Sequence, residues 1–504
     1  MKFKTGGKSR TFLSLSYVYI LLPFLIFAAG WMKAYIAAPV IAIVLVCFWK
    51  MCKESPKLWI PEITRENVIK ILFILGVIAI WVYMSGIGKF VYQNRDHQVR
   101  NAIFNILVEY DWPVVNYDIL SKYAGEFDVT GLIYYIGYWL PSALVGKIFG
   151  LRVGYYAQAV WAVIGIALVY YYICARAKKV VIWPLWIIIF FSGLDIIGVY
   201  LTNADIASYE SIWHAEWWSN PYQYSSTTTQ LFWVFNQAVP AWLCTMLVYV
   251  QKNNRNLVFI LACCMLCSTF PFVGLMLIVL FVCFTRKYEA LEAFSSSDWK
   301  VKVREYFKIL IKDTCTVQNV IAGGLIGILS FLYLFGNGSG GRMFQQDPRG
   351  VAYYNSLPKL VLFLILEMVV YGVLVYRYNQ RNKLYYFILV CLCVIPPIRV
   401  GYSTDFCMRA SIPFLFLLTI LVIEAVERSW KERRYSLFAG LVIVLIIGSA
   451  TPVLEIKRTW TYTFERINTD MTVYEEDKDT IEVLNAPNFS GDIQNNFFFK
   501  YIAR

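Results

Sequence analysis

Long apolar runs, separated by short polar segments, recur along almost the whole chain. A membrane hydrocarbon core about 30 Å thick requires about 17–25 mainly apolar residues in each crossing helix. Runs near this length predict an all-α polytopic membrane protein with about 13 transmembrane helices. The expected spans are residues 12–29, 33–49, 68–88, 154–174, 180–200, 231–250, 256–268, 271–284, 318–336, 359–377, 384–398, 409–427 and 435–455.

Three apolar runs need separate interpretation. The run at 131–150, GLIYYIGYWLPSALVGKIFG, would invert every later basic loop if it crossed the membrane. We therefore expect it to lie on the outer surface, with Pro141 as a break. The run at 256–284 is too long for one span and breaks at TFPF, which predicts two short helices. The run at 12–29 has a basic leader but lacks a small-x-small cleavage site, so we interpret it as a retained helix.

Basic residues set the expected orientation, because cytoplasmic loops carry an excess of lysine and arginine. With the N-terminus inside, the cytoplasmic segments hold 27 of the 46 lysines and arginines. These segments are 1–11, 50–67, 175–179, 251–256, 285–317, 376–383 and 428–434. The C-terminus is then expected outside.

The spans divide the chain into three parts. Residues 1–67 would form two additional N-terminal transmembrane helices and a cytoplasmic linker. Residues 68–455 would form a transmembrane core, and 456–504 a small extracytoplasmic C-terminal tail. The outer loops of the core are expected at 89–153, 201–230 and 337–358.

Composition supports the membrane assignment. Of the 504 residues, 59% are hydrophobic and only 16% are charged, whereas soluble domains average about 45–50% and 25%. The net charge of +13 indicates anionic partners, and in this setting we expect membrane lipids rather than nucleic acid. The twelve cysteines include several inside apolar runs, such as CCMLC, where cysteine behaves as a small hydrophobe. Neither a disulfide framework nor a metal site is predicted.

The stretch YQNRDHQVRNAIFNILVEYDWP (92–113) places charged side chains directly after an apolar run that ends near Gly88. Apolar residues recur at helical spacing in it, which predicts an amphipathic helix at the membrane interface. These residues are Val99, Ile103, Ile106 and Leu107. The charges would therefore lie where a helix end meets both lipid and water.

Three consecutive pieces of residues 94–179 share an order with one known family. They are NRDHQVRNAIFNILVEYDWPVV, GLIYYIGYWLPSALVGKIFGLR and YYAQAVWAVIGIALVYYYICARAKK. This order resembles the first outer loop of GT-C glycosyltransferases, in the protein mannosyltransferase and aminoarabinose transferase branch. The chain departs from that pattern in having Asp96–His97 for an acidic pair, no proline pair before the YY helix, and two extra N-terminal helices.

The resemblance implies a GT-C-like bundle in a bacterial plasma membrane. Its activity would be the transfer of a sugar from a polyprenyl-phosphate-linked donor to an extracytoplasmic glycan, lipid or protein. The family's catalytic acid falls on Asp96. Inverting transfer needs one carboxylate to accept the proton of the acceptor, and the phosphate leaves readily without a second acid. The other interpretation of Asp96 is an ion pair with Arg95 or Arg100. No cofactor is expected, because the outer loop lacks a DxD-type metal motif.

Guanidinium groups near the outer ends of helices are candidates to bind the donor phosphate. Arg95 and Arg100 flank Asp96. Arg409 lies in DFCMRASIPF (405–414), and Arg399 precedes that stretch. Arg342 lies in the glycine-rich loop GNGSGGRMFQQDPRG. Local ion pairs or contacts with lipid headgroups are the alternative role of each arginine.

The segment YESIWHAEWWSNPYQYSSTTTQ (209–230) is a candidate platform for the acceptor sugar. Aromatic faces stack on sugar rings and carboxylates bind hydroxyls, which favours Glu210, His214, Glu216 and Trp217. Asp111 is a further acceptor candidate. The same aromatic residues would also suit an ordinary interfacial belt.

Two other functions remain compatible with the sequence. One is a glycan polymerase or ligase that uses a polyprenyl-diphosphate donor. The other is a transporter or flippase of lipid-linked glycans, for which the mid-span Glu367 is a suitable residue. Asp195 lies nearer the outer end of its span and is a candidate to line the active cavity. A transporter would be expected to contain internal repeats, and no repeat is recognisable here.

Overall fold

The computed structural model describes residues 7–116, 130–205, 214–292, 298–337, 351–353, 356–400, 404–468 and 488–504. Helices dominate these ranges, and the strands among them are only two or three residues long. Nine helical segments are long and apolar enough to cross a membrane, or ten if one bent pair counts as a span. The prediction of an all-α polytopic membrane protein is therefore confirmed.

The nine segments follow the predicted apolar runs. They are α1 (Thr11–Trp31), α2 (Ala34–Glu54), α3 (Arg65–Met84), α6 (Leu151–Ala177), α7 with α8 (Trp183–Phe190 and Asp195–Thr202), α9 (Thr227–Val250), α11 (Thr269–Glu292), α14 with η5 and α15 (Leu357–Leu364, Ile365–Val369 and Val370–Asn379), and α19 with α20 (Tyr435–Gly448 and Ala450–Asn468). The candidate spans counted in α11 and in α19 with α20 are Thr269–Arg286 and Tyr435–Phe464. The central α9 is almost entirely buried.

The predicted number of about 13 spans is not confirmed. Helices α10 (Leu257–Met265) and α16 (Lys383–Val394) have only nine and twelve residues. Helix α18 (Ile412–Lys431) is long enough, but its last two turns are strongly charged. The bent pair joins α12 (Trp299–Thr314) to a helix over Gln318–Leu334 at 69°. As predicted, the run at 256–284 forms two helices, although α11 is not short.

Residues 131–150 do not form a crossing helix. Strand β4 (Thr130–Leu132) is followed by the turn η1 (Gly137–Trp139) and by α5 (Leu140–Phe149). Ten residues of helix rise only about 15 Å, half the thickness of a hydrocarbon core. Pro141 does not break this helix, contrary to prediction, because it occupies the first turn of α5, where proline is tolerated.

The C-terminal segment is not a separate tail. Helix α20 continues past residue 455 to Asn468. Strand β7 (Ser490–Asp492) then pairs with β4, which also pairs with β3 (Val115–Asn116). At the end of the chain, Arg504 donates its backbone N–H to the carbonyl of Trp31. The last residues therefore pack against the first span and the outer-loop region.

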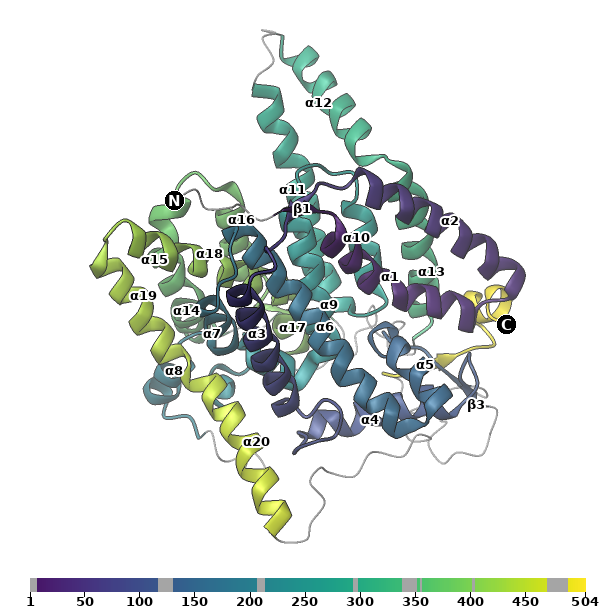
Figure 1. The fold of residues 1–504 in the computed structure, drawn as a ribbon, viewed down its shortest axis with the longest axis horizontal. Helices are drawn as coiled ribbons and strands as arrows, with labels where there is room; N and C mark the ends of the chain where they lie inside the picture. Colours follow the sequence, from purple (N-terminus) through teal and green to yellow (C-terminus); the bar gives the residue numbers. More distant parts are fainter. Residues whose placement is uncertain are drawn as a thin grey trace.

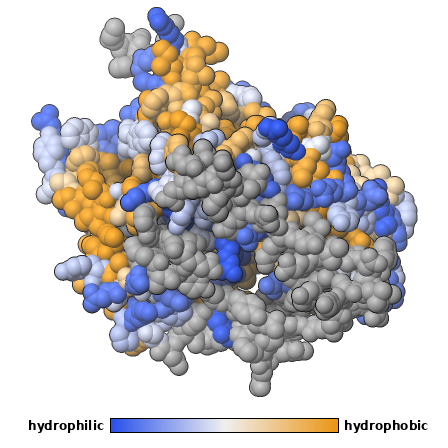
Figure 2. All heavy atoms as spheres, turned by 90° about the horizontal axis from the view of Figure 1, so that it is seen from below, coloured by the Kyte–Doolittle hydropathy of each residue, from blue (hydrophilic) through white to orange (hydrophobic). Residues whose placement is uncertain are grey.

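Two ends of the bundle can be distinguished. Figure 1 shows α4 (Arg95–Glu109), α5 and the end of α20 at the bottom, and α12 at the top. Between them, exposed apolar side chains cover α2, α3 and α19, as expected of surfaces that face lipid. Figure 2 shows the molecule from the α4 end, where hydrophilic atoms lie in a central hollow.

A cysteine at Lys178 tests which end is cytoplasmic. Lys178 is exposed just after α6, at the end opposite α4. In a background without the exposed Cys315 and Cys393, we expect Lys178→Cys to react with a membrane-impermeant maleimide only after cells are permeabilised. Asp111→Cys, at the α4 end, should react in intact cells. Ready labelling of Lys178→Cys in intact cells would show that the protein has the opposite orientation in the membrane.

Candidate active site

Helix α4 carries the charged residues singled out by the sequence. Its N-cap is Asn94, whose side chain accepts a hydrogen bond from the backbone N–H of Asp96. Asp96 in the first turn also complements the positive end of the helix dipole. The apolar residues Ile103, Ile106 and Leu107 are fully buried. The predicted helix is therefore confirmed, and it packs its apolar face against the protein.

Two side chains fix the start of α4 to the central span. The Asn94 amide donates to the carbonyl of Phe232 at 2.8 Å, and Nε2 of His97 lies 3.0 Å from the same oxygen. Val234 has a non-helical backbone (φ −136°, ψ 34°) within α9. This break interrupts the helical hydrogen-bond pattern beside Phe232. The Phe232 carbonyl accepts hydrogen bonds from α4 instead. The position of Asp96 is thereby set by α9.

A cavity of about 530 Å³ lies beside the start of α4. That volume is within the range of small-molecule sites. The cavity brings together five residues that the sequence singled out, from three separate segments: Arg95 and Asp96 of α4, His214 and Trp217 at the turn η2 (Ala215–Ser219), and Arg409 of α17 (Asp405–Ala410). Trp233 and Thr229 of α9 complete one wall. We call this space the α4 cavity.

Two carboxylate–guanidinium pairs lie at the α4 cavity. Oδ2 of Asp96 is 2.9 Å from Nη2 of Arg100, and Oδ1 of Asp405 is 3.1 Å from Nη2 of Arg409. Arg409 also donates to the hydroxyl of Tyr135 at 3.3 Å. Burial raises the pKa of the Asp405 carboxyl, although the adjacent Arg409 opposes this shift. The two carboxylates are similarly exposed, with 40% of the Asp96 side chain and 37% of the Asp405 side chain accessible.

The arginines of these pairs have donors to spare. Among the described residues, Nη1 of Arg100 and Nε of Arg409 are buried N–H groups without a hydrogen-bond acceptor. Buried donors without acceptors are uncommon and costly. Cationic groups with surplus donors suit a phosphate, which offers several acceptor oxygens. Arg100 itself lies behind Asp96 and does not line the cavity.

A glycine on α11 allows α17 to approach closely. A Cβ atom added to Gly274 would lie 2.1 Å from the carbonyl oxygen of Ala410. No side chain fits in that gap, so the backbone of α17 rests directly on α11. Arg409 precedes Ala410, and its position depends on this contact.

Of the proposed acceptor residues, His214 lines the α4 cavity and Glu216 lies just behind it, with Nε2 of His214 3.7 Å from Oε2 of Glu216. Nδ1 of His214 is 3.0 Å from Oε1 of Glu455, and the indole of Trp233 donates to Oε2 of Glu455 at 2.8 Å. Glu216 does not line the α4 cavity. Its carboxylate accepts hydrogen bonds from Gln223, Ser225 and the backbone of Ser226. Burial raises the pKa of Glu216 to about 7, with His214 opposing the shift. The structure thus gives Glu216 a supporting position rather than the predicted acceptor-binding one.

The other predicted residues lie away from the cavity or outside the described ranges. Asp111 is exposed beyond the far end of α4, about 22 Å along the helix from Asp96. Arg399 lies on β6 (Ile398–Val400), paired with β5 (Val351–Tyr353), and does not line the cavity. Arg342 and Glu210 fall outside the described residues.

Sequence reasoning missed Asp405 and Glu455. Asp405 precedes Arg409 by four residues, a spacing at which opposite charges meet on a helix, and this was the available signal. Glu455 gave a similar local signal, since it pairs with Arg458 three residues later. Its contacts with His214 and Trp233 could not be deduced, because those residues are distant in sequence.

No protein-family model, curated protein or solved structure matches this chain. The case for a function therefore rests on the chemistry of the α4 cavity rather than on likeness of fold. Within the described ranges, no three His, Cys, Asp or Glu side chains form a group that could hold a metal ion.

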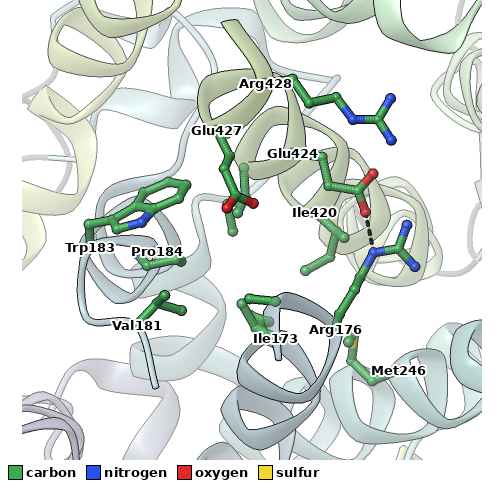
Figure 3. A pocket seen from close by; sticks show the side chains of 12 residues that line it. Ile173, Arg176, Val181, Trp183, Pro184, Met246, Ile420, Glu424, Glu427 and Arg428 are labelled. Atoms are coloured by element: carbon green, nitrogen blue, oxygen red, sulfur yellow. Dashed lines mark ion pairs between the residues drawn. The ribbon is translucent and has the colours of Figure 1, made fainter. Parts of the chain in front are cut away.

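A second cavity, of about 170 Å³, lies at the other end of the bundle (Figure 3). Its polar rim is an ion-paired network in which Nε of Arg176 is 2.6 Å from Oε1 of Glu424. Apolar residues such as Ile173, Ile420 and Pro184 form the rest of its wall. Because its charges already balance, we interpret this cavity as a packing junction between α6, α7 and α18.

His97 makes the start of α4 sensitive to acid. The imidazole donates to the Phe232 carbonyl and accepts from the Gln93 amide, which only its neutral form can do. Burial, aided by the nearby Arg100, lowers the pKa of His97 to about 3. The unfolded chain binds this proton near pH 6.5, so folding stability should fall as the pH drops below about 6.5.

Thermal unfolding of purified protein between about pH 7 and pH 5 tests this expectation. His97→Gln cannot be protonated, so its melting temperature should decline less over that range than that of the wild type. Parallel declines in the two proteins would show that His97 does not contribute.

Proposed function

We propose that this chain is an integral membrane glycosyltransferase that uses a polyprenyl-phosphate-linked sugar donor and an extracytoplasmic acceptor. The observation that carries the proposal is the α4 cavity, in which Asp96 and Asp405 lie beside Arg95 and Arg409. The resemblance of residues 94–179 to GT-C glycosyltransferases supports the same assignment. The acceptor would be a cell-surface glycan, lipid or protein.

In the proposed reaction, Arg409 and Arg95 bind the donor phosphate. Asp96 accepts the proton of the acceptor hydroxyl, whose oxygen attacks the anomeric carbon of the sugar. The bond from that carbon to the phosphate oxygen breaks, and polyprenyl phosphate leaves. Attack opposite the leaving group inverts the anomeric configuration. Asp405 holds the Arg409 guanidinium in place.

The aromatic residues Trp217, Tyr222 and Trp233 suit the binding of sugars. All three line the α4 cavity, together with the polar groups Gln223 and Thr404. Most of the other residues that line the cavity are polar or charged, which suits a ligand rich in hydroxyl groups. These rings would bind the sugar face, while Gln223 and Thr404 would contact its hydroxyls.

The test is a transfer assay with purified protein, radiolabelled polyprenyl-phosphate sugars and a cell-envelope acceptor fraction. We expect labelled acceptor and free polyprenyl phosphate in equal amounts. Transfer only from polyprenyl-diphosphate donors would favour a polymerase or ligase instead. Failure with both donor classes would contradict the proposal.

A transporter of lipid-linked glycans is the second candidate, because of two buried carboxyl groups. Glu367 is 3% exposed and Asp195 is 2% exposed. Asp195 accepts hydrogen bonds from Ser192, Trp218 and Thr451. Intramembrane carboxyls are costly and are commonly functional. Movement of an intact lipid-linked sugar across vesicles, without cleavage of its phosphate bond, would favour this function.

A further inference from the structure

Helix α12 presents two exposed rows of side chains at the end of the bundle opposite the α4 cavity (Figure 1). One side of this helix is held by the protein. Leu310 is buried there, and the hydroxyl of Tyr306 donates to the carbonyl of Phe284 in α11 at 3.2 Å. The side that faces away from α11 carries the two rows.

The first row is apolar. Its members recur at every fourth residue, a spacing that places side chains on one face of a helix. They are Trp299, Val303, Phe307 and Ile311, and between 43% and 66% of each residue is exposed. A contiguous exposed apolar surface of this kind marks a site that binds a membrane or another protein.

The second row is basic. Lys300, Arg304, Lys308 and Lys312 each follow a member of the apolar row by one residue, and all four are exposed. One residue corresponds to a rotation of about 100° around a helix, so the basic row flanks the apolar row. Interfacial helices combine an apolar face with lysine and arginine beside it in this way.

The acidic residues of α12 are drawn to other contacts. The helix contains five basic and two acidic residues, and both acidic residues are half-buried. The Asp313 carboxylate accepts the backbone N–H of Asn254 at 2.9 Å, and Oε1 of Glu305 lies 3.5 Å from Nζ of Lys308. The N-cap Asp298 accepts the backbone N–H of Lys300 at 2.9 Å. Within α12 the exposed face is therefore apolar and basic.

The direction of α12 suits a position along a membrane surface. It meets the helix over Gln318–Leu334 at 69°. That helix exposes Val320, Ile328 and Phe331, as expected of a surface that faces lipid. Spanning helices tilt by only about 20° on average from the bilayer normal, so α12 runs closer to the membrane plane than to the normal.

We propose that α12 binds the anionic surface of a phospholipid leaflet, with Trp299 and Phe307 inserted between the headgroups and the basic row at their phosphates. Tryptophan is enriched at this depth of a membrane, and polybasic segments beside spanning helices bind anionic leaflets. An acidic protein would match the charge. The bilayer is favoured because the lipid-facing helix over Gln318–Leu334 begins directly after α12.

Spin-label accessibility in lipid nanodiscs tests the proposal. Phe307→Cys carries a nitroxide, in a background without the exposed Cys315 and Cys393. The discs contain phosphatidylcholine alone or in equal parts with phosphatidylglycerol. In the mixed discs we expect the nitroxide to be relaxed by oxygen, which concentrates in lipid, more than by a water-soluble nickel chelate. In phosphatidylcholine alone the chelate should dominate.

The triple variant Lys300→Gln/Arg304→Gln/Lys312→Gln should lose the oxygen preference in the mixed discs. All three side chains are exposed, so we expect this variant to fold. Three basic side chains near an anionic leaflet should change the ratio of bound to free helix by about a hundredfold.

The matched control is Lys53→Gln/Lys57→Gln/Arg65→Gln, which removes the same charge from exposed positions outside α12. These positions lie at the same end of the bundle, where the Gln318 amide donates to Glu54 at 2.9 Å. The control should keep the nitroxide in lipid. Equal oxygen preference in the two kinds of disc, or in the triple variant and its parent, would overturn the proposal, as would dominance of the chelate in every disc. Low accessibility to both reagents would place Phe307 in a protein contact and would also overturn it.

Discussion

Asp96→Asn should lower sugar transfer by about 10²–10⁴-fold while the protein still binds its donor. Asparagine keeps the size of the side chain and can still pair loosely with its neighbours, but it cannot accept the acceptor proton. The Asp96 carboxylate lines the α4 cavity, and 40% of its side chain is accessible. Turnover should therefore fall much more than donor affinity, and kcat and KM measured in the transfer assay separate these effects.

Asp111→Asn is the matched control for this change. It makes the same substitution just beyond the other end of α4, about 22 Å along the helix from Asp96, and should leave transfer unchanged. Near-wild-type transfer by Asp96→Asn would show that Asp96 serves only its ion pair with Arg100. The base would then be sought at Asp405, the other carboxylate that lines the α4 cavity.

Arg409→Gln should weaken donor binding by about tenfold to a hundredfold. A hydrogen bond to a charged group in a partly buried site contributes about 1.5–3 kcal/mol. Only 13% of the Arg409 side chain is exposed, and Asp405 and Tyr135 fix its orientation. The donor KM should rise, while transfer at saturating donor changes less.

Removing Arg409 also leaves the Asp405 carboxylate without its partner, which lowers stability. The double variant Asp405→Asn/Arg409→Gln removes both charges and should recover the melting temperature without recovering donor affinity. Arg152→Gln, at an exposed arginine on α6, should change neither quantity. Recovery of donor affinity in the double variant would show that Arg409 acts only through folding.

The sequence allowed the membrane fold and the central part of the site to be predicted. Apolar periodicity locates spanning helices because a bilayer demands both length and apolarity. Asp96 and Arg409 were singled out for their chemistry at helix ends, and both line the α4 cavity. That they belong to one cavity could not be deduced, since nearly the whole core separates them along the chain.

Long-range pairing accounts for most of what was missed. Residues 131–150 are apolar enough for a helix, but β4 pairs with β7 from the end of the chain. The apolar runs of α10 and α16 are long enough to suggest spans, yet their helices stop after nine and twelve residues. Helix α10 packs against the helix over Gln318–Leu334, and α16 packs against α18. Periodicity along the chain does not record such contacts.

The hydrogen bonds between α4 and the Phe232 carbonyl have a consequence for biogenesis. A chain is synthesised and inserted from its N-terminus. Asn94 and His97 are therefore synthesised well before Phe232, whose carbonyl accepts their hydrogen bonds. Arg409 follows later still. A truncated or stalled chain thus holds Asp96 on an unsupported helix with no opposing guanidinium from α17. Copies that stop before α17 would lack a complete α4 cavity.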